Sequence, residues 1–452
     1  MTKTSSWVTK DRKYLWHPFT QMKDWQVEEV PVIERAAGCY LIDTRGRRYL
    51  DGVSSLWCNV HGHRVKALDT AIKAQLGRVA HSTFLGLTHP PGVELAEKLV
   101  RIAPRGLTRV FYSDSGSESV EIAVKMAYQY WQQRGRPKKK KFVKLTNAYH
   151  GDTVGSVSIG GIELFHKLYK PLLFETFTAP SPYRYRWPTG PDPVRVNRES
   201  LDVLEAVLKK NHKEIAAFVM EPLMQGAAGM IDQAEGYISR ARQLTKKYNV
   251  LLIFDEVATG FGRTGKMFAA NHEKVTPDLM AVAKGITGGY LPLAATLTTE
   301  EVYDAFLGEY DSFRTFFHGH TYTANPLACA AAIANLELFK SRQILRELKP
   351  KVDLLKKRLR DFYRLKNVGD VRQVGLMAGI ELVRDTRTKT PFEPREKIGV
   401  RVIERARKKG AILRPLGAVI VLMPPLGMSQ TELGRLLEIT YEAIDETANE
   451  RN

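Results

Sequence analysis

From about Ala96 to about Leu338 the sequence alternates short apolar runs with stretches of helical periodicity. RVFYS is followed by SVEIAVKMAYQYW, and EIAAFVME is followed, after an Arg- and Lys-rich helical stretch, by VLLIFDE. Strands that alternate with helices usually pair as a mostly parallel sheet with helices on its faces. The alternation therefore predicts an α/β fold for the middle of the chain.

The segments on either side have a different pattern. Residues 1–75 combine short strand-like pieces with turns, including a hairpin turn at Asp43–Gly46. After Leu338, strongly charged helices are followed by the strand-like pieces GLMAGIELV and AVIVLMPP. At 452 residues the chain is also too long for one ordinary core. We predict an N-terminal arm with part of a small domain (1–75), a large domain (76–338) and a C-terminal α+β small domain (339–452).

The formal net charge of +19 would suit a nucleic-acid or membrane partner. Most of the excess is scattered along the chain. The one dense run, Arg134–Lys141 (RGRPKKKK), contains a proline and lacks interleaved aromatic side chains, which single-strand binders use for base stacking. We interpret this run as a solvated loop, and we expect neither a nucleic-acid nor a membrane partner.

Signals for export and for metal binding are weak. The N-terminal residues MTKTSSWVTK contain no apolar secretion signal, and no stretch approaches the 18 apolar residues of a membrane span. Cys39, Cys58 and Cys329 form no CxxC pair, so neither a disulfide framework nor a zinc site is indicated. We expect a cytoplasmic protein without a metal.

Two charged residues stand at the ends of predicted strands. Asp255 ends VLLIFD, and Lys284 ends DLMAVAK. Ligands of open α/β sheets bind outside the carboxyl ends of the strands. A lysine and an acid presented together suit pyridoxal phosphate (PLP), because the lysine forms a Schiff base with the aldehyde and the carboxylate keeps the pyridine nitrogen protonated. Taken singly, Lys284 could equally be an ordinary surface lysine, and Asp255 could equally be a helix or turn cap.

A tight turn with Gly116 and Ser117 opens the predicted helix SVEIAVKMAYQYW. Free backbone N–H groups, a hydroxyl and the helix dipole at such a position make a phosphate site. A capping box of Ser115 with Glu118 is the structural alternative, and the two are compatible. The buried face of the helix is indicated by apolar residues at helical spacing: Val120, Ala123, Val124, Ala127 and Trp131.

A P-loop nucleotide hydrolase is the rival from another class. GFGRTGKM (260–267) nearly matches the P-loop pattern, and VLLIFDE resembles an acidic NTPase strand. However, Met267 stands where a Mg²⁺-binding Ser or Thr is required, and NHEKVTPD interrupts any helix that would follow. These departures make the nucleotide hydrolase the weaker hypothesis.

The motifs SDSGSESVEIAVKMA, NAYHGDT, EPLMQGAAGM, LLIFDEVATGFGRTGK, PDLMAVAKGITGGYLPLAA and HGHTYTANPLACAAA, taken together, resemble the class III (omega) aminotransferases. These are PLP enzymes of fold type I, and the resemblance covers nearly the whole chain. It implies a large domain with a mostly parallel seven-stranded sheet, a smaller α+β domain, and a homodimer with active sites at the interface.

The resemblance also implies roles for individual residues. Lys284 would hold PLP and carry the proton in both halves of a ping-pong reaction, and Thr321 would reach the phosphate of the neighbouring subunit's cofactor. The other cofactor-binding residues would be Gly116, Ser117, Tyr149, Asp255 and Val257. Substrate contacts would come from Trp57, Tyr149, Gly319 and Arg414. Matched motifs also contain residues with either a functional or a structural role: His150, Asp152, Glu221 and Gln225.

LWHPFTQM, DGVSSLWCNVHGH, AHSTFLGLTHPP and RPLGAVIVLMPP resemble the members of this family in biotin biosynthesis, which aminate 8-amino-7-oxononanoate. Arg414 would then bind the substrate carboxylate. Phe19, Leu56 and Val421 replace two tyrosines and a tryptophan of the form that uses S-adenosylmethionine as amino donor, so lysine is a second candidate donor. The resemblance is also compatible with a broad omega-transaminase acting on amines or diamines, and with an aminomutase of the same fold.

Overall fold

The computed structural model describes residues 3–450. Within them the largest sheet has seven strands in the order β4-β12-β11-β10-β7-β5-β6. β12 runs antiparallel to both of its neighbours and all other neighbours are parallel, so the prediction of a mostly parallel α/β sheet is confirmed. The strands are β4 (Leu107–Ser113), β5 (Lys141–Leu145), β6 (Thr176–Ala179), β7 (Ile215–Met220), β10 (Leu251–Asp255), β11 (Leu279–Val282) and β12 (Ala294–Thr299).

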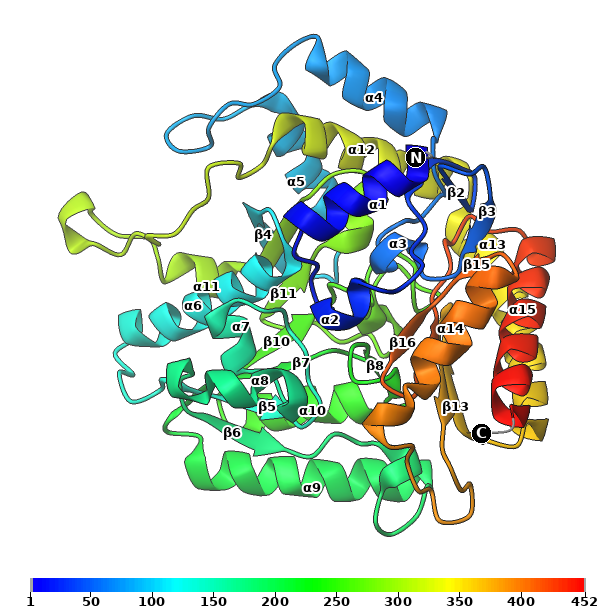
Figure 1. Ribbon diagram of the computed structural model, residues 1–452. Helices are drawn as coiled ribbons and strands as arrows, with labels where there is room; N and C mark the ends of the chain where they lie inside the picture. Colours follow the sequence, from blue (N-terminus) through cyan, green and yellow to red (C-terminus); the bar gives the residue numbers. More distant parts are fainter. Residues whose placement is uncertain (1–2, 451–452) are drawn as a thin grey trace.

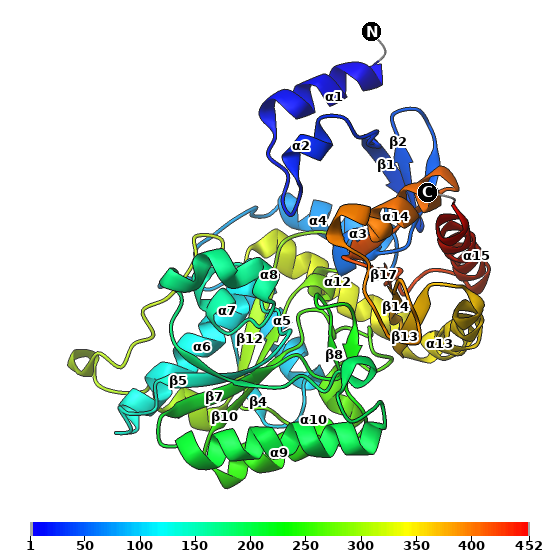
Figure 2. The same ribbon diagram turned by 60° about the horizontal axis from the view of Figure 1, so that its bottom comes forward.

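Helices cover both faces of this sheet (Figures 1 and 2). In Figure 2, α9 and α10 lie on one side of it and α6 and α7 on the other. Leu251 and Ile253 of β10 belong to the cluster that contains α6, whereas Leu252 and Phe254 belong to the larger core that contains α9 and α10. Burial on both faces explains why this strand is a continuous apolar run. The helices are α4 (Lys66–Leu76), α5 (Pro90–Ile102), α6 (Gly116–Gln133), α7 (Val154–Ser158), α8 (Glu163–His166), α9 (Pro193–Asn211), α10 (Tyr237–Lys247), α11 (Glu300–Asp304) and α12 (Pro326–Ser341).

Segments from both ends of the chain form the remaining sheets. β15 (Ala411–Ile412) pairs with β3 (Arg48–Asp51), so the N-terminal and C-terminal segments share one sheet, β1-β2-β3-β15. A second sheet, β13-β14-β17-β16, is antiparallel throughout. The domain boundaries at residues 75 and 338 stay a prediction. The other elements are β1 (Ile33–Ala37), β2 (Tyr40–Asp43), β8 (Met224–Gln225), β9 (Ile231–Asp232), β13 (Val368–Val374), β14 (Met377–Leu382), β16 (Arg414–Leu416), β17 (Val419–Leu422), α1 (Lys3–Tyr14), α2 (Met22–Trp25), α3 (Ser54–Trp57), α13 (Ile344–Leu359), α14 (Ile398–Lys408) and α15 (Gln430–Asn449).

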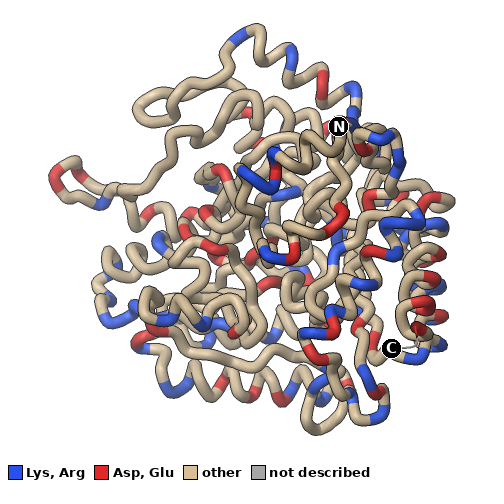
Figure 3. The backbone as a smooth tube through the Cα atoms, viewed as in Figure 1, with Lys and Arg blue, Asp and Glu red and all other residues tan. Residues whose placement is uncertain are grey.

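The basic residues are spread over the molecule and interleaved with acidic ones, as along α9 (Figure 3). The solvated-loop interpretation of Arg134–Lys141 is wrong for Lys139, which is only 5% exposed. Its Nζ donates to the carbonyl oxygens of His212, Ile215 and Asn249, at 2.8, 3.0 and 2.6 Å. This ammonium thus joins the ends of α9 and α10 to the start of β7, where helix C-terminal carbonyls favour a cation. In the part of the chain that the structure describes, no helix is long and apolar enough to cross a membrane.

Candidate functional site

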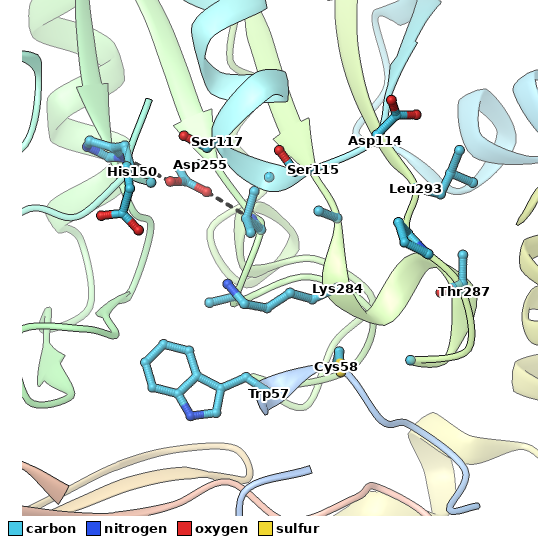
Figure 4. Close-up of a pocket in the computed structure, with 18 of the residues that line it drawn as sticks. Trp57, Cys58, Asp114, Ser115, Ser117, His150, Asp255, Lys284, Thr287 and Leu293 are labelled. Atoms are coloured by element: carbon cyan, nitrogen blue, oxygen red, sulfur yellow. Dashed lines mark hydrogen bonds and ion pairs between the residues drawn. The ribbon is translucent and has the colours of Figure 1, made fainter. Parts of the chain in front are cut away.

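The carboxyl ends of β10 and β11 open into a cavity of about 760 Å³. The two strands pair in parallel, with Asp255 opposite Ala281, and this pairing brings Asp255 and Lys284 to the same edge of the sheet. Both line the cavity, together with Trp57 from the N-terminal segment. Figure 4 shows the Lys284 side chain extending between Asp255 and Trp57.

Lys284 begins the short 3₁₀ helix η4 (Lys284–Thr287) with a backbone φ of +45°, in the left-handed region that non-glycine residues rarely adopt. Its Nζ lies 5.5 Å from the centroid of the Trp57 ring. Among residues 3–450, no hydrogen bond or ion pair to this amine is present. Burial lowers the pKa of Lys284, while attraction to Asp255 and Glu221 opposes the shift. Lys284 is therefore a free amine shifted toward its neutral, nucleophilic form.

Asp255 is 4% exposed and held from two sides. Its Oδ1 accepts a hydrogen bond from the Val257 backbone N–H at 3.0 Å, and its Oδ2 lies 2.8 Å from His150 Nδ1. A carboxylate only accepts, so Nδ1 of His150 carries the proton. Both contacts are drawn in Figure 4. The buried His150 Nε2 has no partner among the described residues. The carboxylate is thus fixed in direction before any ligand binds.

The N-terminus of α6 forms another wall of the cavity. Ser115 and Glu118 form the predicted capping box. Gly116 allows a close approach, since a Cβ there would lie 2.5 Å from Val257 Cγ1. Ser117 Oγ lies 2.9 Å from Thr153 Oγ1 and accepts from the Thr153 backbone N–H at 3.0 Å. The helix start thus presents N–H groups and a hydroxyl to the cavity, an arrangement suited to an anionic phosphate.

Tyr149 and Glu221 line the cavity beside Asp255. The Tyr149 hydroxyl donates to Asp152 Oδ2 at 2.7 Å, and its backbone N–H donates to Glu221 Oε1 at 3.1 Å. Burial raises the pKa of Glu221 to about 7. Gln225 does not line this cavity; its side chain accepts from Ser181 and donates to the carbonyl oxygen of Thr146, so its role here is structural.

Three residues that the resemblance assigns to the site lie outside this cavity. Arg414 lies half-buried on β16, where burial lowers its pKa and Tyr149 attracts it. It makes no ion pair or hydrogen bond with residues 3–450, so a surface salt bridge does not explain it. Gly319 and Thr321 are exposed and line a separate cavity of about 1030 Å³. They belong to the connection between α11 and α12, part of which projects from the body of the molecule (Figure 1), while its His318 and His320 lie against Lys125 and Glu118 of α6.

Several residues of the cavity wall were not predicted from the sequence. Asp114 directly follows β4, and this position at a carboxyl strand end was the signal that could have found it. No comparable pattern marks the other unpredicted residues of the wall, among them Cys58, Thr153 and Thr287.

The segment 260–267 does not form a P-loop. No long helix follows it, since the next element is the four-residue 3₁₀ helix η3 (Ala269–His272). Arg263 at its centre is 2% exposed and donates its hydrogen bonds to protein groups. The rival prediction of a nucleotide hydrolase is therefore wrong.

The donor set of the cavity fits PLP. An unpaired lysine amine suits the aldehyde, a fixed buried carboxylate suits the pyridine nitrogen, and the start of α6 suits the phosphate. A Cβ at Gly116 would intrude on Val257, so this close approach is reserved for a glycine. In residues 3–450 no group of His, Cys, Asp and Glu could hold a metal ion.

Comparison with known proteins gives the family. The model of the family "Aminotransferase class-III" matches residues 22–444. The "adenosylmethionine-8-amino-7-oxononanoate aminotransferase" of Anoxybacillus flavithermus is 53% identical, covering 100% of this chain and 99% of that relative. The crystal structure of the enzyme of that name from Methanocaldococcus jannaschii has a TM-score of 0.94 and 46% identity, covering 98% and 99% of the two chains.

A PLP-bound amine transaminase from an uncultivated Pseudomonas species has a TM-score of 0.92 and 36% identity, covering 96% of this chain and 98% of that one. The fold type, the cofactor and the class of reaction predicted from the sequence agree with these similarities. The chain therefore belongs to the class-III aminotransferases and is a PLP-dependent enzyme.

Proposed function

We propose that this enzyme transfers an amino group to 8-amino-7-oxononanoate and forms 7,8-diaminononanoate in biotin biosynthesis. The observation that carries the proposal is the pairing of an unpartnered Lys284 amine with a fixed Asp255 carboxylate in one cavity. Relatives 47–53% identical over nearly the full chain are named for this acceptor.

PLP, when bound, supplies an electron sink that lets an amino group move between two carbon skeletons. Lys284 would hold PLP through its aldehyde; once the substrate amine has displaced it, Nζ would take a proton from the substrate carbon and pass it to the cofactor carbon that carried the aldehyde. Its lowered pKa would keep a fraction of the amine free to accept that proton. Asp255, oriented by His150, would pair with the pyridine nitrogen and favour its protonated form.

The remaining residues bind and orient. The N-terminus of α6, with Gly116 and Ser117, would hold the phosphate, and Val257 would pack against the ring. Trp57 and Tyr149 border the substrate space. Arg414, half-buried and without an ion pair in the described chain, binds the carboxylate of 8-amino-7-oxononanoate.

We propose S-adenosylmethionine as the first donor to test, because the relatives carry it in their names. Lysine is a second candidate donor because of the replacements at Phe19, Leu56 and Val421, and none of these three residues lines the cavity. Phe19 and Leu56 are exposed, 60% and 49%, and Val421 is fully buried in a cluster with Trp57. Val421 can therefore act on a donor only through neighbours such as Trp57 and Arg414, its partner across β16 and β17.

We further infer a homodimer in which Gly319 and Thr321 serve the partner's active site. Both are exposed and do not line the chain's own cavity. The connection between α11 and α12 that carries them has exposed aromatic side chains, with Tyr310 97% and Phe317 72% exposed. Such apolar exposure is typical of a covered interface. The three cysteines are free thiols, which supports a cytoplasmic location.

The test is a visible absorption spectrum of the purified protein, followed by assay of 8-amino-7-oxononanoate with S-adenosylmethionine or lysine. A yellow protein that makes the diamine would support both PLP as cofactor and 8-amino-7-oxononanoate as acceptor. The compound that gives the faster reaction would be assigned as the amino donor. Lys284→Ala is the control, since it should lose turnover while still binding some cofactor. A yellow protein that makes no diamine with either donor would instead be a broad omega-transaminase, a class named among similar solved structures at 34% identity.

A further inference from the structure

Arg263 is a fully buried cation whose described hydrogen bonds reach the Trp57 turn, which borders the cavity, and the segment that follows β17. Its Nη1 donates to the carbonyl oxygen of Pro424 at 2.5 Å. Its Nη2 donates to Ser54 Oγ and to the carbonyl oxygen of Asn59, both at 2.8 Å. Burying a guanidinium without a carboxylate partner is costly, and burial lowers its pKa to about 10. A buried cation with this desolvation cost indicates that its hydrogen bonds have a role in holding the segments that it joins.

The contacts converge on a strained turn. Ser54, Ser55 and Trp57 have φ values of +52°, +62° and +65°, although none is a glycine. Isolated L-residues avoid this conformation, so surrounding contacts must hold it. Ser54 Oγ, which accepts from Arg263, also donates to the carbonyl oxygen of Met423 at 2.6 Å. Asp51 adds a second anchor through the Ser55 backbone N–H at 2.8 Å.

The turn carries Trp57, whose ring lies 5.5 Å from Lys284 Nζ. The same ring packs with Val421 of β17 and with Met423, which follows that strand and directly precedes the Arg263-bound Pro424. Arg263 thus joins the 260–267 segment of the large lobe, the Trp57 turn and the end of β17. The direction of the Trp57 ring depends on all three.

We propose that Arg263 is a positioning residue that sets the Trp57 turn and thereby the shape of the substrate space beside Lys284. It touches neither the cavity nor the reacting atoms, and it acts through Ser54 and Trp57. The backbone of Arg263 is itself fixed, because its carbonyl oxygen accepts from the Leu376 N–H at 2.9 Å. This inference rests on the proposed function, because the substrate used to test it is 8-amino-7-oxononanoate.

The test compares Arg263→Lys and Ser54→Ala with Ser200→Ala in the holoenzyme. Ser200 is a matched control, since it is buried and donates to the Pro180 carbonyl oxygen, far from the cavity. Losing one or two buried hydrogen bonds should raise KM for 8-amino-7-oxononanoate about tenfold in Ser54→Ala, with kcat changed less than about threefold. The visible circular dichroism of bound PLP should also change, because the Trp57 ring beside Lys284 moves.

Ser200→Ala should leave both readouts unchanged. Wild-type KM and wild-type circular dichroism in Ser54→Ala would overturn the proposal. So would a parallel loss of kcat, cofactor affinity and thermal stability, which marks a purely structural role. If Arg263→Lys fails to fold, Ser54→Ala decides alone. If the wild type does not aminate 8-amino-7-oxononanoate, the proposed function fails, and the circular dichroism still tests the position of Trp57.

Discussion

A single methyl group at Gly116 should weaken PLP binding. The Cβ of Gly116→Ala would lie 2.5 Å from Val257 Cγ1 and 3.0 Å from Cγ2. Ordinary carbon contacts begin near 3.5 Å, so about 1 Å of overlap must be relieved by moving α6 or the Val257 side chain. Overpacking of this kind typically costs about 1–3 kcal/mol, which corresponds to a cofactor dissociation constant raised roughly 5- to 150-fold.

The same geometry predicts a rescue. Val257→Ala removes both methyl groups that the new Cβ would meet. It should weaken PLP binding modestly by itself, because Val257 is proposed to pack on the ring. In the double variant the overlap is absent, so the two free-energy changes should not add. Titration of apoenzyme with PLP, followed by visible absorbance, gives the four dissociation constants of the cycle.

Two results would contradict this reasoning. Wild-type affinity in Gly116→Ala would show that the helix start tolerates a side chain and does not closely border the cofactor. Additive losses in the double variant would show that Val257 is not the group the methyl meets. Thermal denaturation of the apoenzymes measures how much of the cost falls on folding, because the overlap lies between two groups of the protein; only the remaining weakening of PLP binding counts for the prediction.

Three further predictions concern charged side chains. Arg414→Ala should raise KM for 8-amino-7-oxononanoate roughly 10- to 150-fold, since a charged hydrogen bond is lost, while steady-state rates with an uncharged ketone stay unchanged. Lys139→Met should lower the free energy of unfolding in urea by about 3 kcal/mol, because three carbonyl groups lose their donor, whereas the exposed Lys138→Met should change it by less than about 0.5 kcal/mol. Burial raises the pKa of Glu256 from 4.5 to about 7, so its contribution to stability is present below pH 4.5 and is lost as the pH rises to 7. Glu256→Gln should therefore flatten the plot of melting temperature against pH between pH 4.5 and 7. An unchanged slope in this variant would contradict the prediction.

The sequence predicts the large lobe well because its signals are local. A strand buried on both faces must be apolar throughout, and a helix that packs on a sheet must be apolar on one face. For this reason β10 and α6 can be predicted from their own residues. The ends of such strands are equally readable. Asp255 and Lys284 can be assigned to one site from the strand pattern alone, since parallel strands bring their carboxyl ends to one edge.

The burial of individual charged residues cannot be predicted from the local sequence in the same way. Lys139 lies in a run of four lysines, and only the arrival of three carbonyl groups from α9, α10 and β7 distinguishes it from its exposed neighbours. Arg263 lies in a near P-loop motif whose local pattern suggested a different class of protein. Its actual partners, Ser54 and Pro424, are 209 and 161 residues away in the chain, beyond the reach of any local pattern.

The position of Thr321 requires a different explanation, since no hydrogen bond or ion pair of its side chain to residues 3–450 accounts for it. Thr321 is exposed, in a connection between α11 and α12 that also carries the exposed Tyr310, Phe313 and Phe317. A monomer would leave this apolar surface in water, whereas a partner subunit would cover it. The carboxyl edge of the sheet supplies a lysine, an acid and a helix start, but the two residues assigned from HGHTY, Gly319 and Thr321, are absent from it. In the proposed homodimer a second copy of the chain would meet both requirements at once, because the surface that would be covered also carries Gly319 and Thr321.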